Sequence, residues 1–473
     1  MGITYELTPH GVVDRYTSHE GIVHNNINEL GYDWEQVGDP AIEPRYPSKV
    51  YLPQTTEDIV AAVKEVNALG QKLTVRGSGH SSNDLVVVEG GVLMSTSRLN
   101  KILAVDEEAM TAKVQAGAIS AEIDASLLAG GYGLPVLGDH NDITVGGFSS
   151  VGGISPVSHR LGLFIDNVQE IEYVTPDGEL RACSKSNNRS ELFKVLGGTG
   201  QHGIIATLTC NIIRIDKYGT ILRNKASLYR KLDRFLEASG RFLNDPGDAM
   251  MGRGGWIDMP APGMQIRVGM LSVYVQTSQS WYKSLRDKFG YGYLHRIGHW
   301  AGITPRPIEL LLKGLGFLGL VFSPKYGSIK NVECFTDRIT TSTVGDPTRW
   351  FVLICPTDKY EVVAKKLYEL ALDCRHEHSC FTFVCLYIKG IRSEYLAKGD
   401  PNKLFCELTL YLGINLKAMN RQILVDLVSA IDDLCVEYGS YRYMHTMTVK
   451  DPDRRRRIDP NASYAETVRT ASS

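Results

Sequence analysis

The stretch Val75-Arg76-Gly77-Ser78-Gly79-His80-Ser81-Ser82-Asn83 decides which fold we expect. It continues a run, Lys72 to Arg76, that is typical of a short strand. Gly77 and Gly79 leave the turn without side chains, so consecutive backbone N–H groups can crowd around an anion such as a pyrophosphate. On spacing alone, a tight turn with a surface histidine explains the stretch equally well.

Two further glycine-rich segments follow. Thr144 to Ser155 reads as a turn that could approach a flat cofactor closely, because its glycines leave the backbone bare. Gly198 to Gly203 satisfies the dinucleotide pattern G-x-G-x-x-G, which should follow a strand and open a helix. Here the helix-like Glu191 to Leu196 precedes it and the β-branched Ile204 to Ile215 follows. We therefore expect no Rossmann nicotinamide site.

These segments, with Asn167 to Val174 between them, resemble in order and spacing the vanillyl-alcohol oxidase and p-cresol methylhydroxylase (PCMH) family of flavoproteins. Cytokinin dehydrogenase and gulonolactone oxidase are the most similar branches, and the resemblance covers about residues 45–216. It implies a PCMH-type FAD-binding fold and an FAD-dependent oxidoreductase. Such an enzyme would oxidise a small molecule at a C–H bond next to an amine or alcohol by hydride transfer to flavin N5, and O2 or another acceptor would reoxidise the flavin.

The family's functional residues carry over position by position. The resemblance implies that His80 is joined covalently to the flavin 8α-methyl group. It also assigns cofactor binding to Arg76, Gly77, Ser78, Gly79, Ser81, Asp139, Thr144, Gly147, Ser150, Ile154, Ile204, Tyr441 and His445. Asp139 matches the acid that takes the substrate proton in cytokinin dehydrogenase, although without the resemblance it reads as a turn cap beside Gly138.

Departures from the family pattern narrow the expected chemistry. The stretch Ala249 to Trp256 supplies no counterpart to the second acid of cytokinin dehydrogenase, which argues against an adenine-like substrate. Asp139 to Asp142 contains no cysteine, so we expect a single flavin link through His80. The His-Trp-Ala-Lys signature of aldonolactone oxidases is absent, which argues against sugar lactones. The small Gly138, where relatives control oxygen entry, favours an oxidase.

The 473 residues divide by pattern into a lead-in (1–44), an FAD-binding domain (45–216), an α+β substrate domain (217–440) and a segment returning to the first domain (441–473). Thr55 and Asp58 predict the capped start of a helix that Gly70 ends. Further helices are expected at 121–128, 228–243, 360–374 and 417–438. Strands are expected at 91–94, 111–116, 168–175, 203–215, 350–355 and 380–388.

Composition excludes several classes of function. Lys and Arg number 51 against 53 Asp and Glu, so no basic surplus favours nucleic acid. No apolar run is long enough to span a membrane, and the start does not resemble a secretion signal. Nine scattered cysteines read as reduced thiols of a cytoplasmic protein, and those of Cys374 to Cys380 fit no usual zinc-ligand spacing.

Two alternatives remain open. A reductase or epimerising dehydrogenase of the same fold would exchange electrons with a nicotinamide or a quinone. From another class, a flavin-fold binding protein would have lost its chemistry, although the intact 77–81 loop and Asp139 argue against it.

Overall fold

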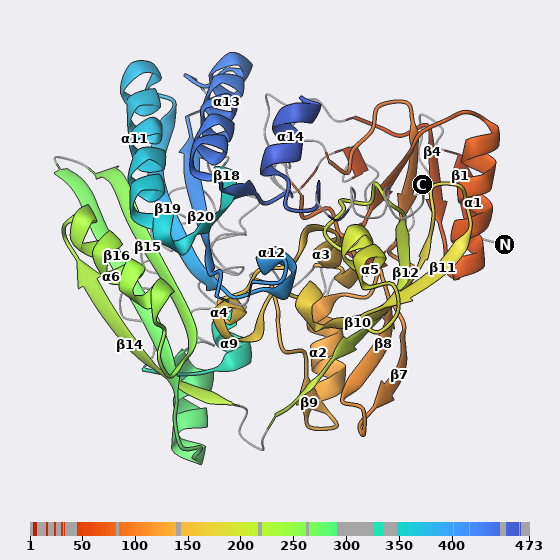
Figure 1. The fold of residues 1–473 in the computed structure, drawn as a ribbon, viewed down its shortest axis with the longest axis horizontal. Helices are drawn as coiled ribbons and strands as arrows, with labels where there is room; N and C mark the ends of the chain where they lie inside the picture. The colour runs from red at the N-terminus through yellow and green to blue at the C-terminus, as the bar shows by residue number, and fades with distance from the viewer. Residues whose placement is uncertain are drawn as a thin grey trace.

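The computed structural model describes residues 3–6, 16–17, 23–24, 30–31, 33, 45–81, 85–138, 143–215, 220–261, 264–290, 325–333, 348–400, 402–415, 417–444, 451–462 and 464. Helices and mostly antiparallel sheets give this part an α+β fold (Figure 1). Within it, no helix is long and apolar enough to cross a membrane.

Two sheets form the half of the molecule drawn in red to yellow in Figure 1. The four-stranded sheet has the order β1 (Ile3–Glu6), β4 (Lys49–Leu52), β6 (Val92–Ser95) and β5 (Leu73–Arg76), with β4, β6 and β5 parallel. The five-stranded antiparallel sheet has the order β11 (Leu180–Ser184), β10 (Val168–Val174), β12 (Ile204–Asn211), β8 (Thr111–Gln115) and β7 (Ile102–Asp106).

Helix α1 (Thr56–Ala68) joins these two sheets. The predicted cap at Thr55 is confirmed, and the structure adds a reciprocal bond that makes it a capping box: Thr55 Oγ1 accepts from the Asp58 N–H at 3.2 Å, and the Asp58 carboxylate accepts from the Thr55 N–H at 3.1 Å. Gly70, with φ of +64°, follows the last turn as predicted. The buried face of α1 packs in one apolar cluster with residues of β4, β6, β10 and β12. This packing fixes where β5, and the loop after it, must lie.

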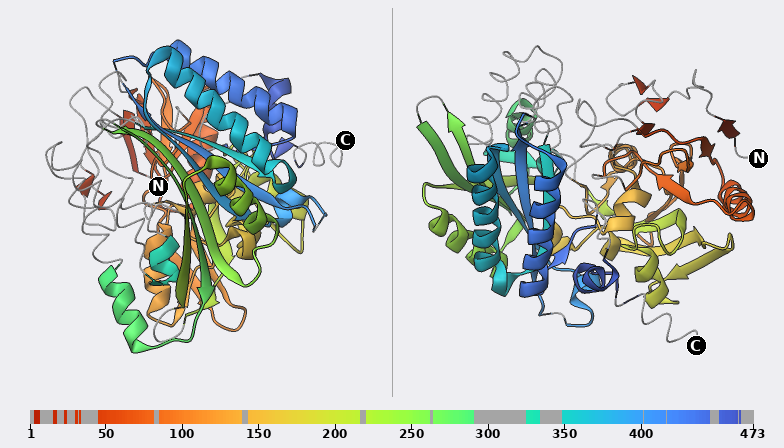
Figure 2. Two further views of the ribbon diagram at one scale, coloured as in Figure 1. Left: turned by 90° about the vertical axis from the view of Figure 1, so that its left-hand side faces the viewer. Right: turned by 90° about the horizontal axis from the view of Figure 1, so that it is seen from above.

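An eight-stranded antiparallel sheet forms the other half (Figure 1). Its order is β17 (Tyr326–Ser328), β14 (Ile221–Tyr229), β16 (Met264–Gln276), β15 (Ala249–Ala261), β19 (Phe381–Ile391), β20 (Phe405–Ile414), β18 (Thr348–Pro356) and β21 (Tyr441–Arg442). Three helices cover one face, as Figure 2 shows from the side: α6 (Leu232–Asn244), α11 (Tyr360–His378) and α13 (Arg421–Tyr438).

Side chains alternate between the two faces along each strand, and this determines which residues lie on the face of the eight-stranded sheet that the three helices do not cover. On β20, Cys406, Leu408 and Leu410 pack into the core beneath the helices. Because successive side chains point to opposite faces of a sheet, Glu407 and Thr409 face the other way. On β18, Val352 and Ile354 share that opposite face and pack into the same apolar core as the first half. The uncovered face of this sheet is therefore turned toward the first two sheets.

A helix over residues 281–290 and several short elements lie outside these sheets and their covering helices. The short elements are α2 (Ser120–Leu128), α3 (Val145–Val151), α4 (Ser158–Leu161), α5 (Arg189–Val195), α9 (Ile329–Glu333), α12 (Glu394–Ala397), α14 (Pro452–Ile458), the pair β9 (Tyr132–Gly133) with β13 (Ile213–Arg214), the pair β2 (Tyr16–Thr17) with β3 (Val23–His24), and 3₁₀ turns at Ile165–Asn167 and Thr357–Lys359.

The structure differs from the sequence-based elements in several places. Thr144 to Ser155, expected as a glycine-rich turn, contains helix α3, and the helix expected from residue 417 begins at Arg421. The helix expected from residue 228 begins at Leu232, because Leu228 and Tyr229 still pair with β16. The long strand expected over 203–215 breaks at Ile212, and its second piece pairs with a different partner, β9. The lead-in contributes strand β1, which carries too little periodic pattern to be predicted but adds an edge to the first sheet.

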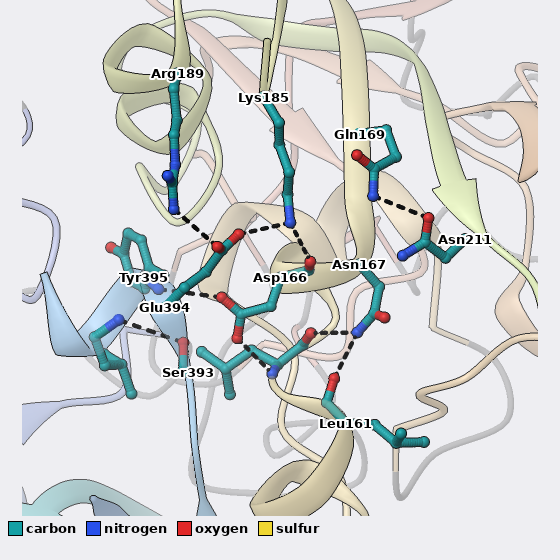
Figure 3. Close-up of polar contacts among 12 residues, drawn as sticks. Leu161, Asp166, Asn167, Gln169, Lys185, Arg189, Asn211, Ser393, Glu394 and Tyr395 are labelled. Carbon is teal, nitrogen blue, oxygen red and sulfur yellow. Dashed lines mark hydrogen bonds and ion pairs between the residues drawn. The ribbon is translucent and has the colours of Figure 1, made fainter. Parts of the chain in front are cut away.

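A polar cluster around Asp166 joins the 3₁₀ turn after α4 to α12 (Figure 3). The Asp166 carboxylate accepts from the backbone N–H groups of Leu163, at 2.7 Å, and Tyr395, at 3.1 Å. Glu394 pairs with Lys185 at 2.6 Å and with Arg189 at 2.8 Å. Burial raises the pKa of Asp166 from 3.8 to about 6, and the nearby Glu394 charge adds to this effect.

This shift predicts a pH-dependent stability. Between about pH 4 and pH 6 the native state keeps a proton on Asp166 that the unfolded state releases, so the free energy of unfolding falls as pH rises through this window. The loss is at most about 3 kcal/mol, and the partial exposure of Asp166 lowers that figure. In Asp166→Asn this part of the pH dependence disappears, which melting curves from pH 4 to pH 7.5 would show. Asp373→Asn, exposed on α11, is the control; an unchanged slope in Asp166→Asn contradicts the assignment.

Candidate functional site

A cavity of about 490 Å³ lies between the glycine-rich loops of the first half and the uncovered face of the eight-stranded sheet. This volume is typical of a small-molecule or cofactor site. Its lining combines three loops from the first half with side chains of β18, β19 and β20 and with Tyr443.

The loop after β5 forms one end of the cavity. Gly77 to Ser81 all line it. A Cβ atom at Gly77 would lie 2.2 Å from Thr144 Oγ1, and one at Gly79, where φ is +81°, would lie 2.2 Å from the Arg76 guanidinium. These glycines are therefore required by the close packing of the loop on Thr144 and Arg76. His80 Nδ1 lies 3.3 Å from Ser78 Oγ, which holds the imidazole beside the loop.

The second and third loops form the middle of the cavity. Thr144 caps α3 by accepting from the Gly147 N–H at 3.3 Å, and Gly147 and Ser150 line the cavity. The Thr199 N–H donates to the Ser150 carbonyl at 2.8 Å, which fastens the 198–203 loop to α3. Near Gly200 a Cβ atom would meet nothing within 4 Å, so the backbone there borders open space.

The sheet supplies the remaining wall. Trp350 and Val352 come from β18, Lys389 from β19 and Glu407 from β20, while Tyr443 follows β21. Tyr443 joins the wall to the loops, because its hydroxyl oxygen accepts from the Gly153 N–H at 3.0 Å. Burial raises the pKa of Tyr443 well above its ordinary value, so this residue stays a neutral phenol.

Ser81 provides a specific test of whether the loop suits a phosphate-bearing cofactor. Ser81 lines the cavity, and its Oγ atom is buried with no hydrogen-bond partner among the described residues. A buried hydroxyl without a partner is costly, typically by about 1–3 kcal/mol. A phosphate oxygen would satisfy this hydroxyl, so the residues present fit the pyrophosphate of FAD.

The structure brings together most of the sequence-derived site residues. Ten of them line the cavity: Gly77, Ser78, Gly79, His80, Ser81, Thr144, Gly147, Ser150, Ile154 and Ile204. Arg76 does not line it and instead lies buried beneath Gly79, with its guanidinium 3.5 Å from the Val86 carbonyl. Tyr441 is also absent from the lining; its hydroxyl accepts from Lys398 at 3.4 Å. Asp139 and His445 lie outside the described residues.

Sequence reasoning missed the sheet wall. Trp350, Val352, Lys389, Glu407 and Tyr443 line the cavity but were not predicted. A signal existed for two of them, since Lys389 and Glu407 are lone charges inside otherwise apolar strands. Their meeting depends on the register of β19 against β20, which pairs Lys389 with Glu407 and cannot be read from either segment alone.

Among the described residues, no group of three or more histidine, cysteine, aspartate or glutamate side chains gathers as a metal site would need. The arginine run of α14 is engaged in ion pairs, with Arg454 joined to Asp433, Arg455 to Asp459 and Arg456 to Asp453. Arg455 also donates to Thr199 at 3.5 Å, which places α14 against a loop of the cavity.

Comparison with known proteins agrees with this geometry. Residues 47–184 match the family model described as an FAD binding domain. An uncharacterized oxidoreductase of the fasciation locus of Rhodococcoides fascians is 36% identical over 208 residues, which are 44% of each chain. Cytokinin dehydrogenase 2 of Arabidopsis thaliana is 33% identical over 162 residues, 34% of this chain and 32% of the relative. Cytokinin dehydrogenase 10 of Oryza sativa subsp. japonica is 35% identical over 168 residues, 34% and 30%.

Residues 47–184 therefore match an FAD-binding domain, and the chain is similar, at modest identity and over less than half of its length, to oxidoreductases that include cytokinin dehydrogenases. The similarity spans less than half of the length of these curated relatives. It includes the 77–81 loop and α3, whereas the sheet wall with Lys389 and Glu407 lies beyond the matched domain.

Proposed function

We propose that the chain is a two-domain, FAD-dependent enzyme that oxidises a small molecule at a C–H bond next to an alcohol or amine. The FAD would occupy the cavity, joined to His80, and O2 or another acceptor would take up the electrons. One observation carries this proposal: a single cavity extends from the glycine loop, which suits a pyrophosphate, to a sheet wall that presents a lysine and a glutamate.

Bound FAD would supply a two-electron acceptor for a hydride. Residues of the chain would bind the cofactor, orient the substrate and exclude water. Gly77 to Ser81 would hold the pyrophosphate through backbone N–H groups and Ser81 Oγ, while Ile154 and Ile204 would contact the rings. The sheet wall would orient the substrate and exclude water.

Asp139 remains the proposed proton acceptor. Its segment, 139–142, lies outside the described residues, but the residues on either side, Gly138 and Ile143, both line the cavity. The position of these two flanking residues supports our proposal that Asp139 accepts the substrate proton. The small Gly138 supports access of O2, which favours an oxidase over a reductase.

Anaerobic and aerobic assays of the purified protein test this proposal. With a screened alcohol or amine, we expect the flavin absorbance near 450 nm to bleach without air and peroxide to appear in air. Bleaching without peroxide would favour the same-fold dehydrogenase or reductase. Protein that takes up no FAD on reconstitution would contradict the enzyme and favour the binding-protein alternative.

A further inference from the structure

Two charged side chains stand out in the cavity wall. The described residues that line the cavity include one lysine, Lys389, and one glutamate, Glu407, but no arginine or aspartate. Both side chains are more than nine-tenths buried. Lys389 Nζ donates to Glu407 Oε2 at 2.9 Å. A buried ion pair is weak evidence for stability, because removing two charges from water offsets most of their attraction. A pair placed in the wall of a ligand cavity instead indicates a function.

The pair is held in place by its neighbours. Thr409, fully buried, donates from Oγ1 to Glu407 Oε1 at 2.8 Å. Cross-strand pairing of β19 with β20 sets Lys389 directly opposite Glu407. A carboxylate offers about four acceptor positions, so Glu407 keeps acceptor capacity beyond these two contacts. The geometry provides a donor and an acceptor side by side at the cavity.

A second cation lies on the same face. β15 pairs Gly254 with Ile388, and both of these face the helices. Arg253 and Lys389, one step further along each strand, therefore share the opposite face. Arg253 is buried and lies 6.0 Å from the Tyr274 ring. Arg253 itself is not among the residues that line the cavity, where Lys389 and Glu407 supply the opposite charges.

We propose that Lys389 and Glu407 form the substrate subsite and that it selects a neutral hydroxyl group over an amine or a carboxylate. A hydroxyl can donate to Glu407 and accept from Lys389 at once. An ammonium group can only donate and would face the Lys389 cation, while a carboxylate can only accept and would face Glu407. Trp350 lines the same cavity, stacked on Tyr411 with ring centroids 4.0 Å apart, four residues along β20 from Glu407. It offers a surface for an apolar part of the substrate.

This inference rests on the proposed function and chooses between its two substrate classes. The test uses the full-length flavin-loaded protein and three matched probes: benzyl alcohol, benzylamine and benzoate. Binding is measured as a perturbation of the flavin absorbance near pH 7, where the amine is an ammonium ion. We expect the wild type to bind benzyl alcohol about tenfold or more tightly than either charged probe.

Variants then change the charge of the subsite. Lys389→Met leaves Glu407 as the local charge and should shift preference toward benzylamine by about tenfold, whereas Glu407→Gln should shift it toward benzoate. Lys366→Met, exposed on α11, is the control and should change neither. Because each single variant leaves a buried charge, we also use the double variant Lys389→Met/Glu407→Leu, which leaves none and should fold. Without the donor and the acceptor, it should bind benzyl alcohol about tenfold less tightly than the wild type.

Outcomes separate this inference from the proposed function. Wild-type protein that binds no flavin contradicts both. Flavin-loaded wild type that binds the charged probes as well as benzyl alcohol, or binds none of the three, overturns the subsite alone. The same holds if the double variant binds benzyl alcohol as tightly as the wild type does.

Discussion

A Gly79→Ala variant is expected to lose most of its FAD, while a Gly90→Ala variant keeps it. Both glycines have positive φ, +81° and +63°, so an alanine suffers a similar backbone cost, about 1–2 kcal/mol, at either position. At Gly79 the new Cβ would also lie 2.2 Å from the Arg76 guanidinium, whereas at Gly90 it would meet nothing within 4 Å. The comparison therefore isolates the packing of the loop.

The displaced Arg76 would carry the loop with it. Arg76 is buried and its guanidinium packs beneath Gly79, so the added Cβ would displace Ser78 to Ser81 from the positions in which they line the cavity. We expect the affinity for FAD to fall at least about tenfold. Flavin absorbance per polypeptide measures this, and circular dichroism confirms that both variants fold. Equal flavin content in the two variants would contradict the role of the loop.

An Arg442→Leu variant is expected to lower the free energy of unfolding by about 3–5 kcal/mol. Arg442, fully buried on β21, donates to Asp432 of α13 at 2.8 Å. Removing the arginine leaves the Asp432 carboxylate buried without its cation, in a position where burial already raises its pKa. The link between α13 and the edge of the eight-stranded sheet would weaken accordingly.

Arg241→Leu is the matched control for this prediction. Arg241 pairs with Glu237 at the same 2.8 Å, but both side chains are exposed on α6, so we expect a change within about 0.5 kcal/mol. The double variant Arg442→Leu/Asp432→Leu should recover much of the loss, because no lone charge remains. Urea midpoints at constant slope measure all three. Equal losses in the buried and exposed variants, or no recovery, would contradict this explanation.

Local pattern predicted those parts of the fold that depend on local chemistry. Thr55, Asp58 and Gly70 define both ends of α1, and the glycine loops that follow β5 and cap α3 have spacings that a sequence displays directly. The site was therefore predictable where backbone geometry forms it. Arg76 shows the limit of this reasoning, since a residue inside the recognised loop packs beneath it rather than facing the cavity.

The sheet wall was not predictable because strand pairing forms it. Lys389 and Glu407 are 18 residues apart and meet through register, and Trp350 and Tyr443 reach the cavity through the order of β18 and β21. Strand alternation shows which residues share a face, but not which strands become neighbours. The same limit applies to β1, whose short segment gains its structure from pairing with β4.

Flavin attachment gives the most direct test of the central claim, that the cavity holds FAD beside His80. The measurement is an absorbance spectrum of the purified protein before and after acid precipitation, with mass spectrometry of the peptide that contains His80. We predict that the flavin stays with the precipitate and on that peptide, and that His80→Ala releases it. Protein without flavin, even after reconstitution with FAD, would contradict the claim; flavin released from the wild type by acid would contradict the His80 link.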